Sequence, residues 1–160
     1  MLQIEAERAD RHQAVRARLL DSFPTRAEAD LVDRLRAEGD AIVSLVAVEG
    51  ERVIGHVMFS RMRGPDRTLG LAPVAVAAGH RRRGIAATLI EAGIAEAAGQ
   101  AWHGIFVLGD PNYYRRFGFS ADAATRFTSP YAGPHFMFRS LAESAPPSGR
   151  ADYAPAFDAL

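Results

Sequence analysis

The chain has 160 residues, which is long enough for one compact domain with a core of its own. Lys and Arg together number 19, and Asp and Glu together also number 19, so no net positive charge recruits nucleic acid. Cysteine is absent, which excludes disulfides, thiolate metal sites and cysteine nucleophiles.

The N-terminal third predicts one strand and two helices. Residues 2–7 alternate apolar and polar side chains, as in a half-buried strand. The capping-box pairs Asp10/Gln13 and Thr25/Glu28 predict two helix starts. The first helix is expected to run through Leu20, and the second is expected to end at Gly39.

The middle of the chain predicts strands around one long helix. Residues 41–62 contain two runs rich in β-branched side chains on either side of Gly50, which is typical of an antiparallel hairpin. A further strand is expected over 69–76, where Pro73 cannot donate a ladder hydrogen bond and favours a bulge or a local splay. A helix rich in Ala, Ile and Leu is expected over 85–98.

The last third predicts a strand at 103–109 and then a helix over 110–118 that begins with Asp110 as N-cap and Pro111 as first residue. A late strand follows at 134–142, and then a loop at 145–150. We expect a single domain over 1–160, in which 143–160 form a C-terminal loop and tail.

The order of these elements implies an α/β (mixed α+β) fold, with a mixed central sheet and helices on both faces. The strand at 69–76, the helix at 85–98 and the strand at 103–109 form a crossover unit, so these two strands should be parallel. The start "MLQIEAERAD" lacks the pattern of a secretory signal, and no apolar run has membrane-spanning length. A cytoplasmic protein without membrane contact is therefore expected.

The stretch "AGHRRRGIAATLIEAG" (78–93) places Arg81, Arg82, Arg83 and Gly84 between a strand and a helix. Backbone N–H groups at a helix N-terminus, with a glycine that permits close approach, favour an anion such as a phosphate. Neither GxxxxGK[ST] nor GxGxxG is present. A solvated basic turn is the alternative, and a nucleic-acid patch is weaker because the cluster is short and lacks interleaved aromatic residues.

Two segments resemble a known family. Residues 81–86 match the Gln/Arg-x-x-Gly-x-Gly/Ala signature of the GNAT N-acetyltransferase superfamily, and "YYRRFGF" (113–119) resembles its aromatic-Tyr-x-x-x-Gly-Phe segment. "LAPVAV", "VLGDPNYYRRFGF" and "DYAPAF" are similar to the bacterial YhbS-like branch. The resemblance implies a GNAT-like sheet of about six to seven strands with a splayed parallel pair.

The resemblance also implies a site for acetyl-coenzyme A (acetyl-CoA). The pyrophosphate would be held by amides of 82–87 with charge from Arg81 and its neighbours, and the pantetheine arm would lie along 74–76. Pro73 would belong to the bulge that opens the cleft. The implied cofactor-binding residues are Val74, Ala75, Val76, Arg81, Arg82, Arg83, Gly84, Ile85, Ala86, Ala87 and Thr88.

In the family motif, Tyr114 aligns with the tyrosine that protonates the leaving thiolate in many relatives. By composition alone, Tyr113 and Tyr114 would instead pack between helix and sheet. The general base stays open, because many relatives carry a Glu on the strand equivalent to 69–76 and this chain has none. A water relay or an amine that arrives neutral is as good a candidate as the turn charges Glu49 and Glu51, the strand residue His56 or the N-cap Asp110.

The implied function is transfer of an acetyl group from acetyl-CoA to a primary amine of a small molecule or a peptide. A non-catalytic acyl-CoA-binding module is the alternative. In relatives the acceptor site is built from segments that correspond here to 20–40, 58–68 and 125–137. No sequence motif in these segments identifies the acceptor. His12, His80, His103 and His135 lack metal-ligand spacing, so no metal is expected. A monomer or a homodimer is expected, without nucleic acid.

Overall fold

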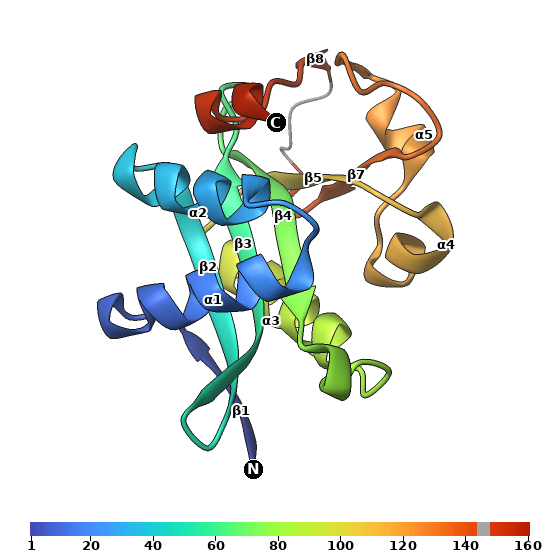
Figure 1. Cartoon of the computed structure of the whole chain (residues 1–160). Helices are drawn as coiled ribbons and strands as arrows, with labels where there is room; N and C mark the ends of the chain where they lie inside the picture. The colour runs from blue at the N-terminus through green and yellow to red at the C-terminus, as the bar shows by residue number, and fades with distance from the viewer. Residues whose placement is uncertain (144–147) are drawn as a thin grey trace.

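A six-stranded mixed sheet organises the protein in the computed structural model, which describes residues 1–143 and 148–160 (Figure 1). The strand order is β1-β2-β3-β4-β5-β7. Neighbouring strands are antiparallel except for the parallel pair of β4 and β5. The sheet strands are β1 (Leu2–Ala6), β2 (Ala41–Glu49), β3 (Arg52–Arg61), β4 (Thr68–Val76), β5 (Gly104–Leu108) and β7 (Phe136–Ser140). The expected mixed α/β fold, its hairpin and its parallel crossover are confirmed.

Helices cover both faces of the sheet (Figure 1). On one face, α1 (His12–Ser22) contacts β3 and β4, and α2 (Ala27–Ala37) contacts β2. On the other, α3 (Ile85–Gly99) contacts β2, β3 and β4. Two separate clusters of buried apolar side chains fill the two interfaces. Among the described residues, no helix is long and apolar enough to cross a membrane.

The two expected capping boxes do not form. A 3-10 turn at Ala9–Arg11 precedes α1, so Asp10 lies inside that turn and pairs with Arg8 at 3.3 Å. The N-cap of α2 is Arg26, which makes no side-chain cap hydrogen bond. At α1 the 3-10 turn moves the helix start past Asp10, whereas at α2 the Thr25 hydroxyl accepts a hydrogen bond from the backbone N–H of Ala27 at 3.3 Å although Arg26 is the N-cap. The capping-box spacing therefore predicted each helix start to within one or two residues, without the reciprocal hydrogen bonds of the box.

The parallel strands β4 and β5 pair only over three residues. Thr68–Gly70 lie in register with Gly104–Phe106, and no later ladder pair joins the two strands. On the other side of β4, Val57 pairs with Val74 and Phe59 pairs with Leu71, so Ala72 and Pro73 together oppose a single residue of β3. This bulge confirms the predicted irregularity at Pro73, and the short register confirms the splay.

The segment after β5 follows the sequence prediction closely. The Asp110 carboxylate accepts a hydrogen bond from the backbone N–H of Asn112 at 2.9 Å, and α4 (Pro111–Tyr114) begins there. A 3-10 turn at Arg115–Phe117 continues it, and Gly118 ends it with φ +86°. Glycine is favoured at position 118 because the backbone there is left-handed.

Short elements complete the C-terminal part of the chain. Between α4 and β7 lie α5 (Ala121–Ala124) and β6 (Phe127–Thr128), and within the expected tail at 143–160 lie β8 (Gly149–Arg150) and a 3-10 helix at Pro155–Ala159. Tyr153 and Phe157 are buried in the core under α1 and α2, and the Tyr153 ring lies against Gly70 of β4. These short elements have no helical or strand periodicity to reveal them, and residues 145–147 of the expected loop lie outside the described residues.

Candidate active site

The loop between β4 and α3 has the backbone geometry of an anion site. Arg82 has φ +67° and Gly84 has φ +74°, whereas Arg83 between them and Ile85 after them have negative φ. Alternation of left- and right-handed residues gathers successive N–H groups into a concave cradle. The free N–H groups at the start of α3 add their partial positive charge at the same place.

A hollow of about 400 Å³ lies over this loop. Its lining joins the end of β4, the loop, the first turn of α3 and α4 with the 3-10 turn that follows it. The lining residues are Val76, His80, Arg81, Arg82, Gly84, Ile85, Ala86, Ala87, Tyr113 and Arg116. Most of the residues expected to hold the cofactor are thus brought to one place.

Four of the expected residues do not line the hollow. Ala75 is buried in the core cluster shared with α1 and α2, and Val74 packs against the opposite cluster. Arg83 Nη1 lies 3.9 Å from the carboxylate of Glu49. The hydroxyl of Thr88 donates a hydrogen bond to the carbonyl oxygen of Gly84 at 2.9 Å. The side chain of Ala75 is buried and that of Val74 is partly buried, so contact of this strand segment with a ligand would be made mainly by its backbone.

That backbone has no strand partner on the β5 side. Because the ladder with β5 ends at Gly70, β4 from Leu71 to Val76 is paired only with β3. The carbonyl oxygen of Val76 accepts a hydrogen bond from Nε of Arg81 at 3.2 Å. Unpaired N–H and C=O groups along a strand can bind an extended ligand in the way that another strand would.

Three lining residues were not identified from the sequence. Arg116 donates from Nε to the carbonyl oxygen of Tyr113 at 3.0 Å, and its guanidinium lies 4.5 Å from the centre of the Tyr113 ring. A spacing of three residues in a helical segment is the signal that pairs them. The third, His80, contacts Glu49 on a distant hairpin, and no sequence signal predicts that contact.

Glu49 does more than mark the hairpin turn. Its carboxylate accepts a hydrogen bond from Nε2 of His80 at 3.1 Å and lies near Arg83. The hydrogen bond from His80 holds the pKa of Glu49 below its usual value, with the charge of Arg83 acting in the same direction. These two contacts connect the end of β2 to His80 and Arg83 of the basic loop.

Tyr114 packs beside the end of β5 and does not line the hollow. Its ring lies against Gly109 and edge-on to Phe119, with ring centres 5.9 Å apart. Among the described residues its hydroxyl has no hydrogen-bond partner. Burial raises the pKa of Tyr114 to about 12, and the neighbouring Tyr113 acts in the same direction. The hydroxyl is therefore a proton donor that stays protonated at neutral pH.

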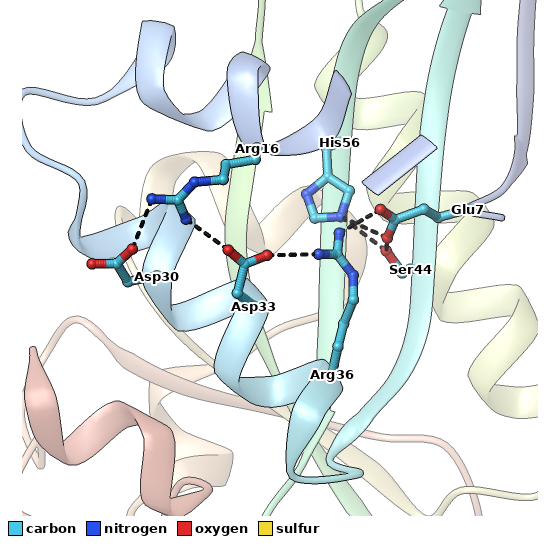
Figure 2. A network of polar contacts seen from close by, with 7 residues as sticks. All are labelled: Glu7, Arg16, Asp30, Asp33, Arg36, Ser44 and His56. Atoms are coloured by element: carbon cyan, nitrogen blue, oxygen red, sulfur yellow. Dashed lines mark hydrogen bonds and ion pairs between the residues drawn. The ribbon is translucent and has the colours of Figure 1, made fainter. Parts of the chain in front are cut away.

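His56 belongs to a buried polar network on the face covered by α1 and α2 (Figure 2). Its Nε2 lies 2.9 Å from the Ser44 hydroxyl, which donates to Glu7. Arg36 of α2 pairs with Glu7, and its other contact is Asp33. Burial lowers the pKa of His56 to about 3, so the ring is neutral. His56 is a core residue and not a candidate for contact with an acceptor, and the network joins α2 to the sheet.

The sequence and the fold are both similar to known proteins. The model of the acetyltransferase (GNAT) family matches residues 9–119. The N-acetyltransferase YhbS of Escherichia coli K12 is 36% identical over 135 residues, which cover 81% of each chain. YjhQ of the same strain, also named an N-acetyltransferase, is 33% identical over 134 residues, covering 75% of this chain and 74% of YjhQ.

Two solved structures share the fold at similar identity. A crystal structure of Escherichia coli YhbS in complex with CoA superimposes with a TM-score of 0.91 at 33% identity, covering 98% of this chain and 92% of that one. A GNAT acetyltransferase of Brucella melitensis in complex with acetyl-CoA gives 0.85 at 31% identity, covering 99% of both chains. The expected resemblance is confirmed, and the chain belongs to the GNAT family of N-acetyltransferases.

Proposed function

We propose that the protein binds acetyl-CoA in the hollow at the N-terminus of α3 and transfers the acetyl group to a primary amine of a small molecule or a peptide. The single observation that carries this proposal is the backbone cradle at Arg82 and Gly84, set beside a length of β4 without a partner on one side. Relatives at 33% and 31% identity bind CoA and acetyl-CoA, respectively, which supports the same ligand here.

The diphosphate of the coenzyme fits the loop by charge and by geometry. The N–H groups from Arg82 to Ala87 would donate hydrogen bonds to it at the start of α3, and the positively charged Arg81 and Arg116 line the same hollow. The guanidinium of Arg83 lies near Glu49, so we propose that Arg83 helps to position the loop and adds positive charge near the diphosphate.

The extended arm of the coenzyme fits the unpaired side of β4. The main-chain groups of Val74, Ala75 and Val76 would hydrogen-bond to its amides, since no strand occupies that side beyond Gly70. A backbone N–H near Val76 would also stabilise the negative charge that develops on the thioester oxygen. Because these are backbone contacts, they place no demand on the side chains of β4.

Acetyl-CoA would supply the activated acetyl group as a thioester. The residues of this chain then have to align the two reactants, exclude water and hold a proton for the departing sulfur. Tyr114 is the candidate for that proton, because its hydroxyl remains protonated and has no hydrogen-bond partner among the described residues. Its pKa of about 12 makes it a hydrogen-bond donor to a thiolate more than a strong acid.

Isothermal titration calorimetry with acetyl-CoA tests the site. Gly84→Glu is the variant expected to disrupt it, and Gly79→Glu is the matched control. Gly84 has φ +74° within the cradle, so a glutamate there is strained and brings negative charge to the diphosphate. Gly79 lies in the same loop with ordinary φ and open space around it, so a glutamate there adds the same charge without the strain.

We expect the wild type and Gly79→Glu to bind acetyl-CoA with affinities within about tenfold of each other, because exposed charges are screened by solvent. We expect Gly84→Glu to lose binding. Equal binding by all three proteins would contradict the assignment of the loop. Release of free thiol in a screen of primary amines then measures transfer directly.

A further inference from the structure

The acceptor amine needs a base that the expected strand does not provide. An alkyl amine is protonated at neutral pH and attacks only after losing a proton. The β4 sequence TLGLAPVAV contains neither carboxylate nor imidazole. Of the groups considered from the sequence, Glu49 is bound to His80, Asp110 caps α4, and His56 is fully buried. Besides the turn residue Glu51, a water relay or an amine that arrives neutral, a base can therefore be sought on another segment near Tyr114.

His135 is joined twice to the residue at the end of β5. The backbone N–H of Gly109 donates to the carbonyl oxygen of His135 at 3.0 Å. The imidazole Nδ1 of His135 lies 3.2 Å from the carbonyl oxygen of Gly109. A carbonyl oxygen only accepts, so Nδ1 must carry the hydrogen. In the neutral ring the lone pair is then on Nε2, which is the nitrogen that can take up a proton.

Gly109 is also the residue against which Tyr114 packs. A Cβ built on Gly109 would lie 2.5 Å from Cε2 of Tyr114, so the phenol ring occupies the space where a side chain would be. His135 and Tyr114 thus both contact Gly109, at the point where β5 has separated from β4. His135 is exposed, so its Nε2 can exchange protons with water after each reaction.

We propose that His135 is the general base for the acceptor amine, an inference that rests on the acetyltransferase function proposed above. Nε2 of His135 removes one proton from the ammonium group. The nitrogen lone pair forms the C–N bond to the acetyl carbon, and the C–S bond breaks with its electron pair on sulfur. The second proton of the nitrogen ends on sulfur by way of Tyr114, and His135 returns the first to water.

The test uses His135→Asn, whose side-chain amide can keep the hydrogen bond to Gly109 but has no nitrogen that accepts a proton. Thiol release from acetyl-CoA is measured with two acceptors, n-butylamine and methoxyamine. Only n-butylamine is protonated at pH 7, so only its reaction needs the base. We expect kcat/KM to fall about 100-fold with n-butylamine and to stay within about twofold with methoxyamine.

Three further readouts separate this role from a structural one. Added imidazole should restore the n-butylamine reaction of His135→Asn, and His103→Asn, at a half-buried histidine outside the site, should behave as wild type. Nitrogen-15 NMR of the wild-type protein should show His135 with hydrogen on Nδ1. Hydrogen on Nε2, an equal loss with both amines or no loss with either would overturn the proposal. Absence of acetyl-CoA binding in the wild-type titration would instead contradict the coenzyme site.

Discussion

The ring of Tyr114 fills the space that any side chain at position 109 would need. A Cβ on Gly109 would approach Cε2 of Tyr114 to 2.5 Å, closer than the two atoms can come. The position of the phenol therefore depends on a glycine that directly follows β5 and has no reactive side chain. This dependence can be tested without changing Tyr114.

Gly109→Ala should displace the phenol while leaving the coenzyme loop intact. We expect the rate of acetyl transfer to fall about 10- to 100-fold, because a shift of about 1 Å in a reacting group has that effect. Acetyl-CoA affinity by calorimetry should change little, since neither residue lines the hollow. Gly99→Ala, at a glycine with open space around it, is the control. Unchanged transfer by Gly109→Ala would show that the ring position does not matter.

Tyr114→Phe should slow transfer about 100-fold and leave acetyl-CoA binding near the wild-type value. The phenol acts while protonated, so its contribution is lost only as the pH rises through its pKa of about 12. Between about pH 6 and pH 10, the ratio of wild-type to variant kcat/KM should therefore be constant. A ratio that declines within this range would contradict the raised pKa. Tyr153→Phe, which removes a hydroxyl group in the core, is the matched control.

His56→Gln should make the protein less sensitive to acid. The pKa of His56 is about 3 in the folded chain and 6.5 for the free side chain, so the unfolded chain binds the extra proton between these values. As the pH falls below 6.5, the free energy of unfolding should decrease by as much as about 1.4 kcal/mol per pH unit from this group. Glutamine can still donate to Ser44 but does not titrate.

Urea unfolding of the wild type and of His56→Gln at several pH values from 7 to 4 measures this difference. The variant should be less stable than wild type at pH 7, and its stability should change less steeply with pH. The half-exposed His12, replaced by Gln, serves as the comparison. Parallel curves for wild type and His56→Gln would contradict a lowered pKa of His56 in the folded chain.

Local sequence determined the conformation of the basic loop between β4 and α3. Three arginines and a glycine between a strand and an alanine-rich helix already specify a left-handed residue and a free helix N-terminus at Gly84. The same is true of α4, where Asp110, Pro111 and Gly118 act on their nearest neighbours. Such features depend on dihedral preferences within a few residues, so they can be read from sequence alone.

Capping-box hydrogen bonds do not form, for the opposite reason. The pairs within 10–13 and 25–28 have the right residues at the right spacing, but each helix begins one or two residues away from the predicted cap. A cap contributes about 1 kcal/mol, which the turn before a helix and the packing of its apolar face readily outweigh. The burial of Tyr153 and Phe157 likewise depends on the surface left open by distant strands.

The sequence by itself determined the family, the order of the strands and helices over most of the chain, and the position of the basic loop to which we assign the coenzyme, because short motifs and hydrophobic periodicity encode them. Only the tertiary structure decided which residues far apart in the chain meet: His80 with Glu49, and His135 with Gly109 beside Tyr114. Both contacts join residues more than 20 positions apart in the chain. Strand register and the splay of β4 from β5 bring such residues together, and both depend on packing across the whole sheet.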